Sequence, residues 1–428
     1  MYKLSKNYKT VLKKIHLLAL ETYKLSFEKS IKIAKKSIAT RRTYSLKKLI
    51  VTKPYSFKTY YQSEPIMPSP VVFTPDMEQI SPDEQQTINA INKAMDYILK
   101  TTYKDYGFPV RSVHAKSHSI LTGTFTVHDH LPPHLAQGIF QTPQQYCAIM
   151  RFSTNPGDIL DDKVSTPRGC AIKIFDVEGE RLPDSQGQVQ DFIMVNGPVF
   201  KSPTLRHFLR GLIPTAATTD KAEGLKIALS TVLQTVEEGL EKVGVQSVAL
   251  AGLGGQPPTS VIGENFFSQV PTLYGPYIAK YRLIPVSSDL LAKKNQKVDL
   301  EGKPNGLRDD NIDFFQTHGG MWHFQVQLCV DIEKMPVEDP TVEWDESLSP
   351  FVTVATLQVQ PQVAWDEARS QRVDDHMSFS PWHGIAAHRP VGAIMRARKS
   401  AYANSADFRS THNAEPIQQP RCPFHFDD

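Results

Sequence analysis

The chain has 428 residues, 40% of them apolar, and a formal net charge of only +3, so it can form one large domain or two to three smaller ones. The near-neutral balance of charge gives no general case for nucleic-acid binding. No apolar run approaches the roughly 20 residues of a membrane span, and the four cysteines form no CxxC pair or zinc-like cluster.

The first 68 residues differ from the rest in charge. They hold 16 Lys and Arg against three acidic residues, and apolar residues such as Val11, Ile15 and Leu18 recur among them at helical spacing. We therefore expect a basic extension outside the fold. A basic amphipathic helix on an anionic membrane surface and an organellar targeting segment stay open as alternatives.

A Pro-rich linker over residues 65–82 leads into the first helix of the folded region. Ser81 is followed by Pro82, and Glu84 lies three residues after the serine. This spacing predicts that Ser81 caps the helix through a capping box. Apolar residues at helical spacing continue the helix to about Tyr103.

Beyond this helix the apolar pattern becomes that of β-strands. The runs are rich in β-branched and aromatic residues, which strands favour, and a closed antiparallel barrel would leave no exposed edge. Helical patterns at residues 202–212 and 221–243, and again in the last 60 residues, complete an α+β arrangement. The predicted strands are residues 119–127, 146–153, 169–177, 190–200, 277–286, 323–331 and 351–360.

The final helical stretch carries a set of residues that could bind a metal ion or an anion. In a helix over residues 398–413, Tyr402 and Arg409 follow Arg398 by four and eleven residues, so all three share one face. A neighbouring guanidinium favours the ionised phenolate, a plausible metal ligand. The same spacing also occurs on ordinary solvent-exposed helices, so the stretch alone leaves both interpretations open.

Four further polar clusters lie at strand ends, and each is weak by itself. They are Arg111-Ser-Val-His-Ala-Lys116, Arg151-Phe-Ser-Thr154, Pro167-Arg-Gly169 and the segment from Asp191 to Phe200. In order and spacing, these clusters and the Arg398–Tyr402–Arg409 set resemble the catalase core family of haem proteins. That family has segments of the forms R-x-V-H-A-K, R-F-S-T, P-R-G-x-A-x-K, D-[FL]-x-x-N-N-x-P-x-F and R-x-x-x-Y, with an arginine seven residues after the tyrosine.

The resemblance spans most of the chain, from about Arg111 to Asn413. Residues 267–285, 335–344 and 379–398 are more similar to a branch of small catalase-like haem proteins. The fold that the resemblance implies is α+β, an antiparallel β-barrel of the catalase type with surrounding helices. The haem domain would cover residues 69–428, with the barrel over about 110–360 and a proximal helix over about 390–410.

The cofactor that the resemblance implies is haem b. The resemblance makes Tyr402 the ligand of the haem iron, a role that tyrosine has in catalase. Arg398 would keep the phenolate ionised. Arg111, Arg151 and Arg409 would pair with the haem propionates, as guanidinium groups pair with carboxylates.

On the opposite side, the resemblance makes His114 the acid/base that moves a proton between the two peroxide oxygens. Ser153 would orient its imidazole, and Val113 would shape the pocket. Catalases place an asparagine beside this histidine, but ungapped alignment puts Val195 there, with Asn196 next. A shift of one residue would restore the amide, so Asn196 is kept as a catalytic candidate and which of the two faces the haem stays open.

The implied function is haem-dependent breakdown of hydrogen peroxide or organic hydroperoxides by a catalase- or peroxidase-type oxidoreductase. A fatty-acid hydroperoxide isomerase or lyase similar to allene oxide synthase is one alternative. A non-catalytic haem-binding or sensing protein is the other. We expect a peroxide or lipid hydroperoxide substrate, no nucleic acid, and a cytoplasmic or membrane-peripheral location. Membrane contact through residues 1–68 and a homo-oligomer stay open.

Overall fold

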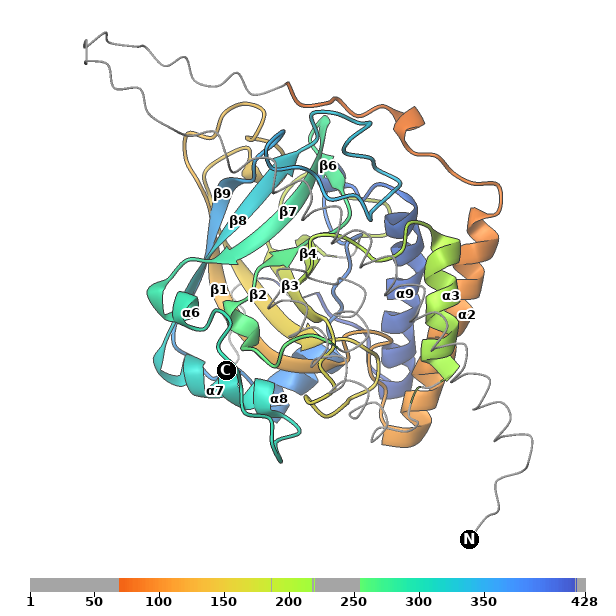
Figure 1. Cartoon of the computed structure of the whole chain (residues 1–428), viewed down its shortest axis with the longest axis vertical. Helices are drawn as coiled ribbons and strands as arrows, with labels where there is room; N and C mark the ends of the chain where they lie inside the picture. Colours follow the sequence, from red (N-terminus) through yellow and green to blue (C-terminus); the bar gives the residue numbers. More distant parts are fainter. Residues whose placement is uncertain (1–68, 186, 218, 220–254, 420, 422–428) are drawn as a thin grey trace, which may run out of the picture. The chain divides into compact units, whose positions relative to one another are not determined.

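The structure, a computed structural model, describes residues 69–185, 187–217, 219, 255–419 and 421 (Figure 1). The basic extension of residues 1–68 and the helix expected over residues 221–243 lie outside the described residues, so these two predictions remain untested. Within the described ranges, no helix is both long enough and apolar enough to cross a membrane.

A β-barrel forms the centre of the described chain. Its sheet has nine strands, each antiparallel to its neighbours, in the order β5-β4-β3-β2-β1-β9-β8-β7-β6. The two-residue strand β5 closes the barrel, because Phe267 pairs both with Val195 of β4 and with Arg282 of β7. Eight strands thus form the ring and β6 extends it from β7. The strands are β1 (Lys116–Val127), β2 (Gln145–Thr154), β3 (Arg168–Phe175), β4 (Val189–Val195), β5 (Phe266–Phe267), β6 (Thr272–Tyr274), β7 (Tyr277–Pro285), β8 (Gly320–Leu328) and β9 (Val352–Val359).

This architecture confirms the predicted α+β fold with a closed antiparallel barrel. Each of the seven predicted strands corresponds to one of the long strands of the sheet, whereas β5 and β6 were missed. Both are only two or three residues long, too short for a period of two to be recognised.

The two faces of the barrel wall carry different side chains because neighbouring residues in a strand point in opposite directions. On β2, β3 and β4, the residues Phe152, Cys170 and Met194 lie opposite one another in register and belong to the apolar core of the barrel. The next residue along forms a second row, in which Ser153 pairs with Gly169 and Gly169 with Val195. This second row faces outward.

Three helices, α2 (Glu84–Tyr106), α3 (Leu205–Ala217) and α9 (Ala393–Asn413), lie side by side next to the barrel (Figure 1). They share one apolar cluster, to which α2 contributes buried residues at helical spacing, including Ile88, Ile91 and Met95. Such a stripe is the pattern by which an amphipathic helix buries one face.

The start of α2 differs from the prediction. The helix begins at Glu84 with Asp83 as the N-cap residue, and no side-chain hydrogen bond caps it, so the capping box at Ser81 was wrong. The carboxylate of Glu84 instead accepts two hydrogen bonds from Arg396 of α9, at 2.7 Å and 2.8 Å. A charge-assisted, two-point pair with another helix is stronger than a local cap, and it fixes α2 against α9.

The remaining elements are short and connect the barrel to its surroundings. They include a single π-helical turn, η4, which is continuous with α8 and supplies part of the site described below. The elements are η1 (Pro75–Met77), η2 (Gly138–Phe140), η3 (Val261–Gly263), α6 (Ser288–Ala292), α7 (Gly306–Thr317), α8 (Glu367–Ser370), η4 (Gln371–Asp375) and η5 (Ala386–His388).

Candidate functional site

A cavity of about 230 Å³ lies between the outer face of the barrel wall and the helices α2, α3 and α9. Its wall on the barrel side is built from the two outward-facing rows of β2, β3 and β4. One row consists of Arg151, Ala171 and Ile193, and the other of Ser153, Gly169 and Val195. The cavity therefore lies outside the barrel, against the face that the apolar core of the barrel does not use.

His114 lies at this wall, in the segment just before β1. Its backbone has φ = 52°, a left-handed conformation that is uncommon outside glycine. The imidazole Nδ1 lies 3.2 Å from the Oγ atom of Ser153. A Cβ atom on Gly169 would stand only 2.7 Å from the same Nδ1, so the ring occupies space that only a glycine in β3 leaves open.

The surroundings of His114 keep its imidazole neutral. Burial, together with the positive charges of Arg151 and Arg398, lowers the pKa of His114 to about 3. At neutral pH the ring can thus accept a proton. If Nδ1–H donates to Ser153, Nε2 is the free base.

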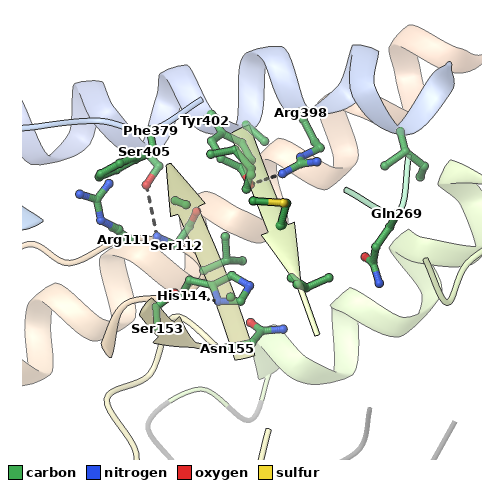
Figure 2. A pocket seen from close by; sticks show the side chains of 18 of the residues that line it. Arg111, Ser112, His114, Ser153, Asn155, Gln269, Phe379, Arg398, Tyr402 and Ser405 are labelled. Atoms are coloured by element: carbon green, nitrogen blue, oxygen red, sulfur yellow. Dashed lines mark hydrogen bonds between the residues drawn. The ribbon is translucent and has the colours of Figure 1, made fainter. Parts of the chain in front are cut away.

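Tyr402 faces this wall from α9, across the cavity (Figure 2). One helical turn earlier, Arg398 donates a hydrogen bond from Nη2 to the phenolic oxygen of Tyr402 at 2.7 Å. A second contact ties the two sides together, because the backbone N–H of Ser112 donates to Ser405 Oγ at 3.2 Å. The predicted face of the final helix is therefore present, with its phenol and Arg398 in direct contact.

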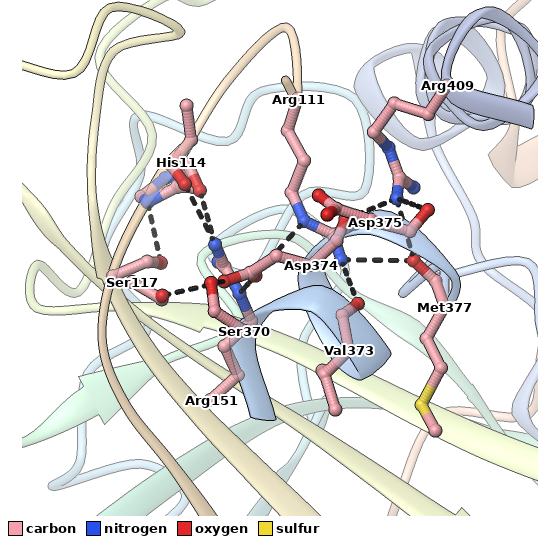
Figure 3. Close-up of polar contacts among 12 residues, drawn as sticks. Arg111, His114, Ser117, Arg151, Ser370, Val373, Asp374, Asp375, Met377 and Arg409 are labelled. Atoms are coloured by element: carbon pink, nitrogen blue, oxygen red, sulfur yellow. Dashed lines mark hydrogen bonds and ion pairs between the residues drawn. The ribbon is translucent and has the colours of Figure 1, made fainter. Parts of the chain in front are cut away.

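One end of the cavity is cationic. Arg111, Arg151 and Arg409 line it together and all three contact the turn η4 and the residues that follow it (Figure 3). The carboxylate of Asp374 accepts a hydrogen bond from Arg151 Nε at 2.6 Å and lies 3.7 Å from Arg111 Nε. This acidic partner was not found from the sequence.

The backbone of the same turn holds the other two guanidinium groups. Arg111 Nη2 donates to the carbonyl oxygens of Val373 and Met377, at 2.8 Å and 3.0 Å. Arg409 Nη1 donates to the carbonyls of Asp375 and Met377, each at 3.0 Å. The turn η4 and the residues that follow it thus help to hold all three arginines.

Each arginine keeps one terminal nitrogen for the cavity. Among the described residues, none bonds Nη1 of Arg111, Nη1 of Arg151 or Nη2 of Arg409. The fully buried nitrogens of these arginines that lack an acceptor among the described residues are Nε of Arg111 and Nε of Arg409, whereas the three terminal nitrogens belong to residues that line the cavity and can donate into it. The three nitrogens therefore define a site for anionic oxygens at this end of the cavity.

The charges in the cluster do not balance. Burial lowers the pKa of Arg111 well below its ordinary value, and it lowers the pKa of Arg409 to about 10. Burial opposes ionisation of Asp374, but the charges of Arg151 and Arg111 outweigh it and hold its pKa below the ordinary value. Burial, together with the charge of Asp374, raises the pKa of Asp375. Three guanidinium groups thus face one firmly ionised carboxylate, and an anion in the cavity would relieve the excess.

The rest of the cavity is mostly apolar. Val113 lines it as predicted, and so do side chains from α2, α3 and α9 and from the segments that precede α3 and follow β5. The apolar lining residues of these parts are Ile91, Met95, Phe200, Leu205, Phe208, Val270 and Ile394. The cavity is therefore amphipathic, with anion-binding groups at one end.

Asn196 is the one predicted site residue that lies elsewhere. Its side-chain oxygen accepts from the backbone N–H of Arg168 at 3.0 Å, and its Nδ2 donates to Glu264 at 2.6 Å. Val195 occupies the cavity wall instead. Val195 is the last residue of β4, so the next residue points to the opposite side of the sheet. The catalytic assignment of Asn196 is corrected accordingly.

Several cavity residues were not found from the sequence. Asn155, Phe379 and Ser405 line the cavity in addition to the predicted residues. Asn155 directly follows the Arg-Phe-Ser-Thr motif, and alternation along β2 was the available signal for its direction. Within the described ranges, no group of three or more His, Cys, Asp or Glu side chains is arranged to hold a metal ion.

No family model matches the sequence. Among solved structures, the chain is similar to a fungal catalase, with a TM-score of 0.51 and 18% identity over 74% of this chain and 62% of the catalase. It is also similar to catalase A from Saccharomyces cerevisiae, with a TM-score of 0.52 and 15% identity over 84% and 72% of the two chains. The chain thus spans less than two thirds of the first of these proteins. At such identities the likeness identifies the fold, which is the antiparallel β-barrel fold of the catalases.

Proposed function

We propose that the protein breaks down hydrogen peroxide or organic hydroperoxides with a haem b cofactor. The observation that carries the proposal is the pair of facing groups across one cavity. Tyr402, hydrogen-bonded to Arg398, lies on one side, and His114, in contact with Ser153, lies on the other. The catalase fold adds to this argument.

The cavity residues fit haem. Haem is a flat apolar molecule with two carboxylates at one edge, and the cavity has apolar walls and three arginines at one end. The free nitrogens of Arg111, Arg151 and Arg409 would hold the propionates. Tyr402 would bind the iron, and the guanidinium of Arg398 would favour its ionised form. When bound, the haem iron would supply the redox chemistry that cleaves the O–O bond.

The side chains on the barrel wall would handle the proton. Neutral His114 accepts the proton from the hydroperoxide O–H and returns it to the other oxygen, which leaves as water or an alcohol. Ser153 holds the imidazole in place, and the histidine ends in the protonation state in which it began. A second peroxide or an organic donor supplies the two electrons that the cleavage consumes.

The test is hemin titration of the purified chain, followed by spectroscopy and turnover. We expect uptake of one hemin per chain with the ferric spectrum of a tyrosinate ligand, and loss of that spectrum in Tyr402→Phe. His114→Ala should retain hemin and lose peroxide turnover. Absence of hemin uptake, or the same spectrum in Tyr402→Phe, would overturn the proposal.

A second candidate function is the isomerisation or cleavage of fatty-acid hydroperoxides on the same cofactor. The observation that favours it is Val195 at the cavity wall, where an apolar side chain suits a hydrocarbon better than a small polar peroxide. Oxygen evolution from hydrogen peroxide supports the first function, whereas consumption of a lipid hydroperoxide without oxygen evolution supports the second. Absence of both from hemin-loaded protein would indicate a binding or sensing protein.

A further inference from the structure

The wall of the cavity beside His114 has few groups that can hold a polar substrate. The outward-facing residues of β3 and β4 that line the cavity are Gly169, Ala171, Ile193 and Val195, which carry no polar side-chain atom. Polar side chains on this wall therefore come from β2 and its continuation.

Alternation along β2 points to one residue beyond the strand. Arg151 and Ser153 face the cavity, so the next residue with the same direction is Asn155. The strand pairing supports this position. Thr154 lies opposite Lys116 in β1 and opposite Arg168 in β3, so Asn155 is one step further along both ladders. Asn155 thus starts a third outward row, next to that of Ser153.

The backbone at Asn155 is firmly held. Its N–H donates to the carbonyl of Pro167 at 3.1 Å, and its own carbonyl accepts a hydrogen bond from Thr166 Oγ1. The residues that follow it pack against the segment of His114. The N–H of Ala115 donates to Pro156 O at 3.2 Å, and a Cβ atom on Gly157 would stand 2.3 Å from the carbonyl oxygen of Ser112. The loop of Asn155 and the segment of His114 are therefore in direct contact.

The side-chain amide of Asn155 is available to a ligand. Figure 2 shows it beside His114, and it lines the cavity without a hydrogen-bond partner among the residues that the structure describes. The other amide that lines the cavity, that of Gln269 in the segment after β5, already donates to the carbonyls of Gly197 and Val199 at 3.0 Å and 2.6 Å. The amide of Asn196 is bonded on the far side of the sheet.

We propose that Asn155 binds and orients the peroxide beside His114. Its amide N–H would donate to one peroxide oxygen while Nε2 of His114 faces the proton to be moved. The inference rests on the proposed function and adds to it the group that directs the substrate. It also explains how a polar substrate can be held although Val195 lines the wall.

The experiment uses the full chain loaded with hemin and fluoride as the probe, because fluoride binds ferric haem and accepts hydrogen bonds from neighbouring donors. We compare Asn155→Ala and Asn155→Asp with wild type. The aspartate has the same shape but cannot donate when ionised. Asn89, on the exposed face of α2, provides the matched control Asn89→Ala.

We expect the fluoride Kd of Asn155→Ala to rise at least roughly ten-fold, the lower end of what one hydrogen bond to an anion contributes. Asn155→Asp should weaken fluoride at least as much, with a matching fall in kcat/KM for peroxide, and Asn89→Ala should bind like wild type. If Asn155→Ala fails to take up hemin, the fluoride Kd of the isosteric Asn155→Asp variant tests the proposal in its place.

Two outcomes distinguish the failure of this inference from that of the proposed function. An intact, Tyr402-dependent spectrum with fluoride Kd and kcat/KM within two-fold of wild type in both variants would reject the role of Asn155 alone. Failure of the wild-type chain to bind hemin would reject the proposed function and this inference with it.

Discussion

Asp374→Asn is the sharpest test of how the cationic end of the cavity is held. Asp374 accepts hydrogen bonds from Arg151 Nε at 2.6 Å, Ser117 Oγ at 2.7 Å and Ser370 Oγ at 2.9 Å, and it lies 3.7 Å from Arg111 Nε (Figure 3). The substitution keeps the shape and removes the negative charge. Arg111 and Arg151 would then lie close together without a carboxylate partner.

The expected cost follows from the burial of the pair. The side chains of Arg151 and Asp374 are 3% and 13% exposed. Removing one partner of a buried ion pair costs about 3–5 kcal/mol, because the remaining charge stays buried and unpaired. The backbone carbonyls of η4 continue to hold Arg111, so we expect the lower end, about 3 kcal/mol, in the free energy of unfolding of the hemin-free protein.

The pH dependence gives an independent check with a definite sign. The pKa of Asp374 is lowered in the folded protein, so its contribution to stability is present above the unfolded pKa and is lost as pH falls through the folded pKa. The unfolded pKa of an aspartate is about 3.9. The difference between wild type and Asp374→Asn should therefore be constant from pH 8 to about 5 and shrink below about pH 4.

The neighbouring Asp375 provides the matched control. Burial and the charge of Asp374 raise the pKa of Asp375, so its ionised form is disfavoured in the folded protein at neutral pH. Asp375→Asn should leave the free energy of unfolding unchanged or slightly higher. Urea unfolding of the three proteins measures both effects. A cost of less than about 1 kcal/mol for Asp374→Asn, or an equal cost for Asp375→Asn, would refute the reasoning.

Three further predictions concern the cavity. Gly169→Ala should displace the imidazole of His114, because the new Cβ would lie 2.7 Å from Nδ1. Peroxide turnover of the hemin-loaded variant should then fall with little change in hemin uptake, and turnover equal to wild type would contradict this. The pKa of His114 is lowered to about 3, so the imidazole stays a neutral base across the usual assay range. The kcat/KM for peroxide should therefore stay level from pH 8 to about 5 and fall only toward pH 3. A fall centred near pH 6.5 would instead indicate an unperturbed histidine. Hemin dimethyl ester, which lacks the propionate charges, should bind at least ten-fold more weakly than hemin, since a charge-assisted hydrogen bond contributes about 1.5–3 kcal/mol; equal affinity would exclude the arginines as the propionate site.

The long strands of the fold were predictable from the sequence because each has a local pattern. Runs such as those of β2 and β3 carry enough β-branched and aromatic residues to identify a strand without knowledge of its partners. The closing strand β5 has only two residues, and its identity depends on pairing with β4 and β7. That pairing is a tertiary contact, which no local pattern records. For the same reason Glu84 was assigned to a cap, although its partner Arg396 lies on another helix.

The candidate site was predictable where a residue lies within a short motif. His114 and Ser153 come together as expected, and Arg398 contacts Tyr402 one turn away on the same helix. Asp374 could not be found in this way, because it lies more than 200 residues from the arginine to which it is hydrogen-bonded. Electrostatic partners that meet only in the folded chain leave no spacing in the sequence.

The position of Asn196 illustrates a different limit. A shift of one residue in a strand moves a side chain to the opposite face of the sheet, so the sequence at Val195 and Asn196 was compatible with two opposite sites. The register decides between them, because Val195 pairs with Gly169 in the outward row that also contains Ser153. The same register makes β2 and its continuation the source of the polar groups on this wall, whereas β3 and β4 supply a glycine and apolar side chains. A hydroperoxide bound here would therefore meet hydrogen-bonding groups along β2 and could lay an apolar substituent over Val195 and Ile193. Under the proposed function, we therefore expect organic hydroperoxides to be substrates alongside hydrogen peroxide.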